Sequence, residues 1–183
     1  MWKGKKHHLR WRARPDGGVW VDNWFSNMGL CSEPITWKDR LFCSIEHAYQ
    51  AAKYVDPEKI TLVQQAARPE QAKWLGRKWS TETPNWETYR VQVMWELCAQ
   101  KWSLAKHRAE LNSHKEPIVE FNNWSDSTWG VVIKPNGEVL GGEDLLGRII
   151  TEIRRQLIEQ PHAIPQITPE FQLVPAPVLH DSI

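Results

Sequence analysis

The chain has 183 residues, a hydrophobic content of 41%, a charged content of 25% and a formal net charge of +1 at pH 7. This length and composition are typical of one globular domain with a buried core, and the near-neutral charge excludes polyanion binding by overall charge alone. Cys31, Cys43 and Cys98 form no Cys-x-x-Cys pair, so reduced thiols, an intracellular protein (cytoplasmic or nuclear) and no metal site are expected.

The first eighteen residues are rich in basic side chains. Six lysines and arginines lie between positions 3 and 14, and no acidic residue precedes Asp16. We predict a flexible basic arm over residues 1–18. It could contact nucleic acid or another polyanion, and it could equally be a leader without such a role. No apolar run approaches the length needed to cross a membrane.

Short elements follow the arm. We expect an extended aromatic segment over 19–25, a polar turn at 26–27 and a hairpin over 34–42. A short helix comes next, with Ser44 as its N-cap, and ends near Val55.

This short helix carries an unusual set of polar side chains. Glu46, Gln50 and Lys53 are spaced i, i+4 and i+7, which places them on one helical face with His47 at its edge. An acid, an amide and an amine on one face can form a catalytic site. The same pattern also fits a first-turn glutamate favoured by the helix dipole and a lysine in water.

Helices dominate the remaining chain. Asp56 and Pro57 begin a helix that runs to about residue 67, and a second helix over 70–75 is stopped by Gly76. Arg77, directly after it, can present a cation to a phosphate or serve the helix C-terminus.

The second half of the chain is expected to contain the longest helix of the protein, a small β region and a final helix. We expect the following elements: a helix over 86–111 with Lys101 on its apolar face, a strand over 117–121, a loop over 122–130, a hairpin over 131–140 and a helix over 143–160. The fold class is α+β, mainly helical, with one compact domain over 19–160 and small β hairpins. Residues 161–183 form a proline-rich tail that is expected to be extended.

Twelve tryptophans are more than a core of this size absorbs easily. Some are therefore expected to line a cleft, where they can stack on a base or cover a sugar.

An ordered set of short motifs resembles the NADAR family, which includes the YbiA-type N-glycosidases. The motifs, spread over roughly residues 24–157, are Phe25-Ser26-Asn27, Glu46-His47-x-x-Gln50-x-x-Lys53, Leu75-Gly76-Arg77, Asn85-Trp86 followed by Val93-Met94, Lys101, Val119-Glu120, Asp126-x-x-Trp129-Gly130, and Leu146-Gly147 with Arg154 further on. The resemblance implies a compact helical YbiA-like fold that needs no cofactor or metal. It also implies hydrolysis of the N-glycosidic bond between a phosphorylated ribose and a base nitrogen.

Three functions follow from the resemblance. The first is removal of ADP-ribose from guanine in DNA or RNA, which the basic arm and the tryptophans favour slightly. The second is cleavage of a ribosylamino-pyrimidine phosphate intermediate of riboflavin biosynthesis. The third is a non-catalytic ADP-ribose-binding module, against which the presence of Glu46, Lys53 and Asp126 together argues.

The chemistry fits the residues of the resemblance. Cleavage of the C1–N bond builds positive charge on C1 and negative charge on the base, and by analogy with O-glycosidases two carboxylates divide this work. Glu46 and Asp126 are the expected pair, although an aspartate in a Ser/Thr-rich loop can also simply cap a turn. Lys53 binds the ribose or phosphate, or attacks C1 to form a Schiff base.

The resemblance also implies a set of substrate-binding residues. Trp86 and Trp129 would line the binding site of the base or sugar. Arg77, with Lys101, would bind phosphate. The full expected set is Phe25, Ser26, Asn27, His47, Gln50, Gly76, Arg77, Trp86, Lys101, Trp129, Gly130 and Asp144. Asp144 stands where the family usually has asparagine, which puts the details of the substrate in doubt.

Overall fold

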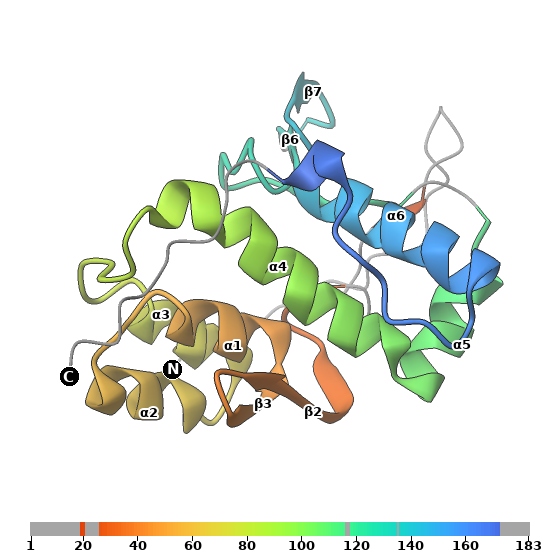
Figure 1. Ribbon diagram of the computed structural model, residues 1–183. Helices are drawn as coiled ribbons and strands as arrows, with labels where there is room; N and C mark the ends of the chain where they lie inside the picture. The colour runs from red at the N-terminus through yellow and green to blue at the C-terminus, as the bar shows by residue number, and fades with distance from the viewer. Residues whose placement is uncertain (1–18, 21–25, 116–117, 135, 173–183) are drawn as a thin grey trace. The chain divides into compact units, whose positions relative to one another are not determined.

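A computed structural model of the protein describes residues 19–20, 26–115, 118–134 and 136–172 (Figure 1). The predicted arm at 1–18, Phe25 and residues 173–183 of the tail lie outside the described residues. The described residues form helices and small sheets joined by loops, which confirms the α+β, mainly helical prediction. The contacts divide the chain into unit 1 (Met1–Ser26 with Lys115–Arg148) and unit 2 (Asn27–His114 with Ile149–Ile183).

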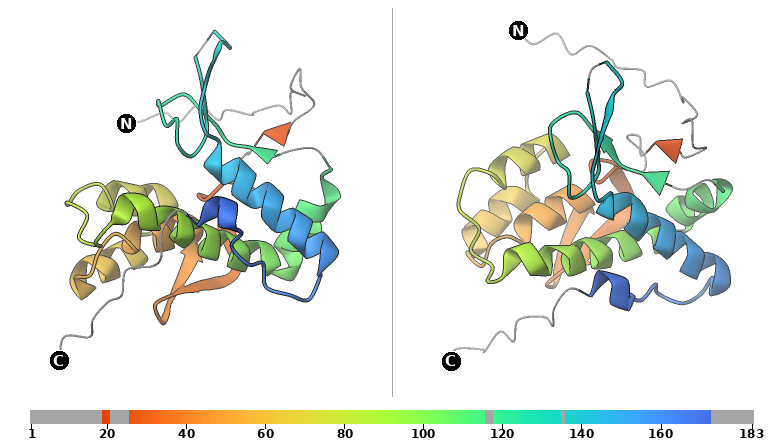
Figure 2. Two further views of the ribbon diagram at one scale, coloured as in Figure 1. Left: turned by 45° about the horizontal axis from the view of Figure 1, so that its top comes forward. Right: turned by 90° about the horizontal axis from the view of Figure 1, so that it is seen from above.

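Helix α1 (Ile45–Ala51) lies at the centre of the packing of unit 2, and every one of its residues is buried. It contacts the strands β2 (Leu30–Trp37) and β3 (Arg40–Ser44) and the helices α2 (Pro57–Gln64), α3 (Pro69–Leu75) and α4 (Trp86–Ser103). The orange hairpin and these helices lie together in all three ribbon views (Figures 1 and 2). A helix that is covered all round holds its polar side chains away from bulk water.

The start of α1 is as predicted, but its end is earlier. The Ser44 side chain accepts a hydrogen bond from the His47 backbone N–H over 3.3 Å. The helix ends at Ala51, so Lys53 lies in the turn that follows it. This turn is fixed from outside, because the Lys53 carbonyl accepts hydrogen bonds from the backbone N–H groups of Glu82 and Thr83.

Local signals also set the neighbouring elements. The predicted hairpin is confirmed, with Ile35 opposite Phe42 in an antiparallel pair, although its first strand already begins at Leu30. In α2, Asp56 accepts a hydrogen bond from the Glu58 backbone N–H over 2.8 Å, which is the predicted N-cap.

The predicted helix over 86–111 is wrong in one respect, because the chain leaves the helix at Leu104, where ψ is 133°. The helices α4 and α5 (Ala105–Ser113) result. The change of direction lets His107 accept a hydrogen bond from the Ser32 backbone N–H and pack edge-on against Trp102. This tertiary packing is the physical reason for the break.

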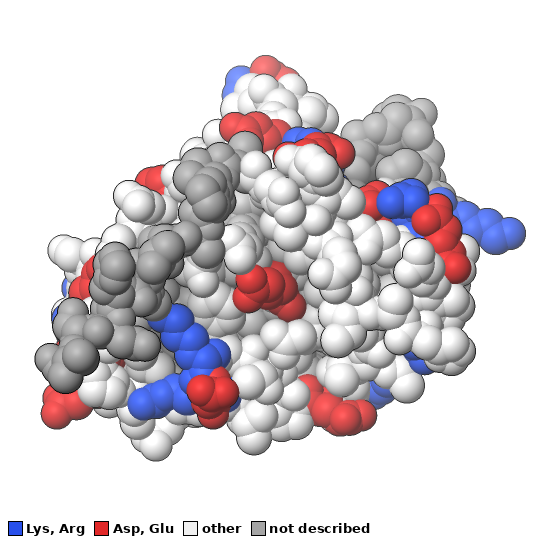
Figure 3. Space-filling view, viewed as in Figure 1, with Lys and Arg blue, Asp and Glu red and all other residues white. Residues whose placement is uncertain are grey.

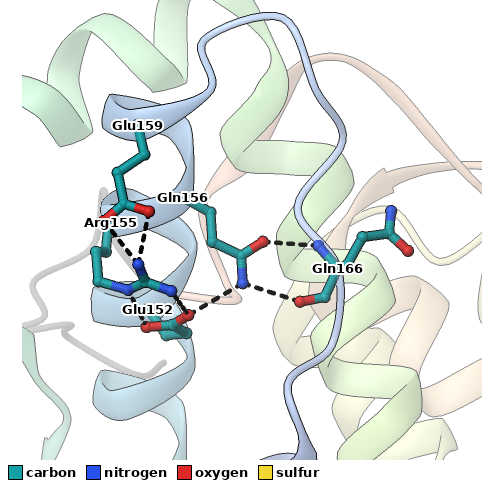
Figure 4. A network of polar contacts seen from close by, with 5 residues as sticks. All are labelled: Glu152, Arg155, Gln156, Glu159 and Gln166. Carbon is teal, nitrogen blue, oxygen red and sulfur yellow. Dashed lines mark hydrogen bonds and ion pairs between the residues drawn. The ribbon is translucent and has the colours of Figure 1, made fainter.

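Helix α6 (Leu145–Glu159) is close to its predicted range. The chain after it folds back on unit 2, which differs from the extended tail expected from its prolines. Gln156 forms two hydrogen bonds with the backbone of Gln166, beside the ion pairs that Arg155 makes with glutamates of α6 (Figure 4). Phe171, in the short 3-10 helix η1 (Pro169–Phe171), is buried with its ring centroid 5.2 Å from that of Trp95.

Unit 1 is built from short strands. Strand β1 (Val19–Trp20) pairs in parallel with β4 (Ile118–Val119), and β6 (Val131–Ile133) lies between β5 (Phe121–Asn122) and β7 (Val139–Gly141). The β6–β7 hairpin confirms the predicted turn at Asn136-Gly137, where Gly137 has a φ of 88°. That the chain forms a single domain over 19–160 stays a prediction. No helix within the described ranges is long and apolar enough to cross a membrane.

Candidate functional site

The predicted polar face of α1 is a buried cluster. Glu46 and Gln50 are only 5% and 4% exposed. Gln50 Nε2 donates a hydrogen bond to Glu46 Oε1 over 2.9 Å. Burying a carboxylate is unfavourable unless it is hydrogen-bonded, so Gln50 both stabilises and orients the Glu46 side chain.

Gly76 completes the surroundings of Gln50. A Cβ atom at position 76 would lie 2.1 Å from Gln50 Oε1, so only glycine leaves room for this amide. The Oε1 atom is buried and has no hydrogen-bond partner among the described residues.

Asn27 supplies a second buried acceptor beside the start of α1. Its backbone carbonyl accepts a hydrogen bond from the Glu46 N–H over 3.0 Å, and its Nδ2 donates to the Met94 sulfur over 3.3 Å. Its Oδ1 is buried and has no partner among the described residues. An unmade hydrogen bond at a buried polar atom costs about 1–3 kcal/mol. The Oδ1 of Asn27 and the Oε1 of Gln50 are thus two buried acceptors beside Glu46 whose hydrogen bonds are not made within the described residues.

Lys53 extends from the turn after α1 toward Gly76. Its Nζ donates to the Gly76 carbonyl over 3.3 Å and lies 5.8 Å from the centroid of the Tyr49 ring. Burial lowers the pKa of Lys53 from 10.5 to about 8, and nearby Arg77 acts in the same direction while Glu46 opposes it. A substantial fraction of this amine is therefore neutral at mildly alkaline pH.

Aromatic rings lie beside Lys53. Trp86 is buried, and its ring centroid lies 5.2 Å from that of Tyr49, at an interplanar angle of 53°. The structure thus connects Trp86 to the α1 cluster through Tyr49. Tyr49 and Met94 were not among the predicted site residues. Tyr49 lies in the same buried helix as Glu46, and Met94 is a buried residue of α4. These positions were the available signal.

His47 is held by bonds within the protein. One ring nitrogen lies 2.8 Å from Ser44 Oγ, and the other lies 3.0 Å from the carbonyl oxygen of Ala66. Both nitrogens are thus engaged, and a direct role of His47 in substrate binding stays a prediction.

The two predicted phosphate-binding cations differ sharply in their surroundings. Arg77 is exposed and directly follows Gly76. Lys101 is 0% exposed, and its Nζ lies 5.1 Å from the ring centroid of Trp102. Burial lowers the pKa of Lys101, whereas the nearby thiols of Cys31 and Cys98 act in the opposite direction. A role of Lys101 in binding phosphate stays a prediction.

Asp126, in unit 1, caps the loop that follows β5. Its Oδ1 accepts hydrogen bonds from the backbone N–H groups of Thr128 and Trp129, over 3.3 and 3.0 Å. The Asn122 side chain accepts a hydrogen bond from the Asp126 N–H and donates one to the Asp126 carbonyl. The sequence did not reveal that Asn122 stabilises this loop. This turn-capping role is the alternative that the sequence left open. A catalytic role together with Glu46 stays a prediction.

The other predicted residues of unit 1 also have structural contacts. Gly130 packs so closely on Glu120 that a Cβ atom there would lie 2.6 Å from the Glu120 carbonyl oxygen. Asp144 Oδ1 accepts a hydrogen bond from the Glu120 N–H over 2.9 Å. Trp129 and Ser26 are half-buried. Their roles in substrate binding stay predictions.

Three further observations concern surface charge, metal ligands and thiols. On the face drawn in Figure 3, lysine and arginine side chains lie beside acidic ones. Within the described part of the chain, no group of three or more His, Cys, Asp or Glu side chains could hold a metal ion. Cys31, Cys43 and Cys98 are free thiols.

Known proteins match most of this chain. Residues 11–158 match the family model of the NADAR domain. An N-glycosidase of Nostoc punctiforme is 31% identical over 125 residues, which cover 66% of this chain and 77% of that protein. The N-glycosidase YbiA of Shigella boydii serotype 4 is 28% identical over 135 residues, which cover 73% and 80%. The NMR structure of the E. coli protein YbiA superposes with a TM-score of 0.60 at 29% identity, over 76% of this chain and 80% of that one.

Proposed function

Because this chain belongs to the NADAR domain family, we propose that it is an N-glycosidase that releases ADP-ribose from guanine in DNA or RNA. N-glycosidase activity is the function for which its curated relatives are named. The guanine-linked substrate is the finer part of the proposal. An intracellular location, cytoplasmic or nuclear, is also proposed and is consistent with three free thiols.

The observation that carries the proposal is the buried Glu46 carboxylate, oriented by Gln50 and adjoined by the Lys53 amine. As the bond between C1 and the base nitrogen breaks, positive charge develops on C1. A carboxylate held in a site of low polarity stabilises such a charge more strongly than one in water. Gln50 and Asn27 would hold this carboxylate in place, because Gln50 bonds its side chain and the Asn27 carbonyl bonds its backbone N–H.

In the proposed mechanism Lys53 acts as a nucleophile that forms a covalent intermediate. With the ribose ring open, C1 is joined to the base nitrogen as an imine. The neutral amine adds to C1, the base leaves with its nitrogen protonated, and a Schiff base joins Lys53 to C1. Water then hydrolyses the Schiff base, which frees the sugar and restores the amine. The lowered pKa of Lys53 supports this role over a purely electrostatic one.

The remaining roles follow the sequence expectations. Asp126 is the proposed second carboxylate, which handles a proton at the departing base or the attacking water. Arg77, exposed beside Gly76, is the proposed phosphate ligand. Trp86 is the proposed wall of the base or sugar site.

The proposal is tested by incubating the protein with guanine-ADP-ribosylated DNA and measuring free ADP-ribose. Release is expected with the wild type. The riboflavin-precursor alternative, which the near-neutral net charge of +1 favours, predicts turnover of the ribosylamino-pyrimidine phosphate and no release from DNA. Binding of ADP-ribose without turnover of either substrate would instead identify a binding module.

A further inference from the structure

The segment over residues 71–81, which ends α3 and leads toward α4 (Figure 1), combines aromatic and basic side chains. Its sequence contains Lys73, Trp74, Arg77, Lys78 and Trp79, and it contains no acidic residue. The Lys78 ammonium lies 5.6 Å from the ring centroid of Trp74 and 5.3 Å from that of Trp79. A cation is thus placed between two indole rings.

Trp74 is unusually accessible for a tryptophan, since 62% of it is exposed. A contact with one lysine at such an exposed site contributes only about 0.5–1 kcal/mol. The exposed Trp74 ring therefore contributes little to the stability of the fold. A flat ring in this position offers a surface on which a base can stack.

Among the described residues, neither Arg77 nor Lys78 forms an ion pair with an acidic side chain. Glu82, the first acidic residue after it, is bound to Lys59 and accepts hydrogen bonds from the backbone N–H groups of Val55 and Asp56. These bonds, that to Lys59 foremost, lower the pKa of Glu82 to about 2. Glu82 is therefore bound to Lys59 of α2 and to the start of that helix, and it does not neutralise Arg77 or Lys78.

The segment also adjoins the candidate site. Lys53 donates its hydrogen bond to the carbonyl of Gly76, which directly precedes Arg77 and Lys78. A nucleotide whose ribose C1 lies beside Lys53 would have its neighbours in the strand within reach of this segment.

We propose that residues 71–81 bind single-stranded nucleic acid beside the ribose site, with a base stacked on Trp74 and phosphates held by Arg77 and Lys78. This inference rests on the proposed function for its biological substrate, but the binding itself can be measured separately. Stacking and charge neutralisation together are the usual means of holding a single strand without sequence preference.

The binding test uses the full chain and a fluorescein-labelled single-stranded oligothymidine without ADP-ribose, followed by fluorescence anisotropy. Trp74→Ala should weaken binding about fivefold or more. Lys78→Gln should weaken it and reduce the salt slope by about 0.7 over about 50–200 mM salt. Since all variants keep the basic residues of positions 3–14, differences between them report on residues 71–81.

Two matched controls define the specificity of the effect. Leu62→Ala removes another exposed apolar side chain, and Lys134→Gln removes another exposed positive charge. Both should bind the strand as the wild type does. The inference would be overturned if Trp74→Ala and Lys78→Gln bound the strand with wild-type affinity, or if the two controls lost as much affinity as these two variants do. It would also be overturned if the protein preferred duplex DNA and Trp74→Ala left that preference unchanged.

A kinetic test separates this inference from the proposed function. The wild type should cleave an ADP-ribosylated single-stranded oligonucleotide with a higher kcat/KM than ADP-ribosylated guanosine, and Trp74→Ala should lose this advantage while it still cleaves the nucleoside. Equal kcat/KM values for both substrates, unaffected by Trp74→Ala, would refute the surface alone. Failure to cleave either substrate would refute the proposed function, and the anisotropy result would still decide the binding inference.

Discussion

Gln50 donates a hydrogen bond to Glu46 within α1, and the Oε1 of the same amide abuts Gly76 at the end of α3. One side chain thus couples the orientation of the carboxylate to the position of a second helix. Gln50 is a positioning residue in this arrangement, because it acts through Glu46.

Glu46→Gln removes the negative charge but keeps the shape of the side chain. Its kcat for release of ADP-ribose should fall by about 10²–10⁴, with an almost unchanged melting temperature. Glu96→Gln is the matched control, since Glu96 accepts the same kind of i, i+4 hydrogen bond from Gln92 on α4. Equal rates of Glu46→Gln and the wild type would refute the catalytic assignment.

Two substitutions separate the capping and catalytic roles of Asp126. Asp126→Asn keeps the oxygen that accepts from Thr128 and Trp129, so it should lose turnover and keep its thermal stability. Asp126→Ala loses both hydrogen bonds and should also be destabilised by about 1–3 kcal/mol. Thermal unfolding and kinetics on the same samples provide the comparison. Turnover of Asp126→Asn at the wild-type rate would leave Asp126 with its capping role only.

The two roles of Lys53 predict opposite pH dependences. As a nucleophile it acts when neutral, so kcat/KM should rise with pH and level off above about pH 8. As a cation that binds phosphate it would lose activity above the same pH. Borohydride should trap a covalent sugar adduct in the wild type and none in Lys53→Ala. An absent adduct together with falling alkaline activity would favour the binding role.

The lowered pKa of Lys53 also affects stability. Between about pH 8 and 10.5 the unfolded chain holds a proton that the folded amine has lost, so stability rises with pH in this window. At pH 7 the buried ammonium is unfavourable, and Lys53→Met should be more stable than the wild type. Urea unfolding should show this difference shrinking as the pH approaches 10. A difference independent of pH would point to packing instead.

Gly76→Ala tests the contact with Gln50. The added methyl group would displace the amide, which should destabilise the fold by about 1–3 kcal/mol and lower kcat by freeing Glu46. In a Gln50→Gly background the Oε1, Cβ and Cδ atoms that the new methyl group would meet are all absent, so the same substitution should cost much less stability. Additive effects in a double-mutant cycle would contradict this coupling.

Those parts of the fold that depend on local chemistry were predictable from the sequence. Ser44 and Asp56 both cap helices as predicted, because a side-chain oxygen at an N-cap bonds the nearest free N–H groups. The end of α4 was not predictable. Neither glycine nor proline marks Leu104, and the break there places His107 on the backbone N–H of Ser32, 75 residues earlier in the sequence.

The candidate site shows the same division. The pairing of Glu46 with Gln50 follows from their spacing of four residues. The fit of Gly76 against Gln50 joins two helices that are separate in the sequence, so no local pattern reveals it. Lys53 was predicted on the helix but lies beyond its end, because residues 82–83 bond to the turn.

The packing of Phe171 against Trp95 moves the practical boundary of the folded protein from residue 160 to about residue 172. A chain shortened to residue 160 would expose an indole face of α4 and deprive Gln156 of both of its backbone partners on Gln166. Newly exposed aromatic surface promotes aggregation. Such a truncated protein would therefore be a poor starting point for expression, whereas truncation after residue 172 preserves these contacts.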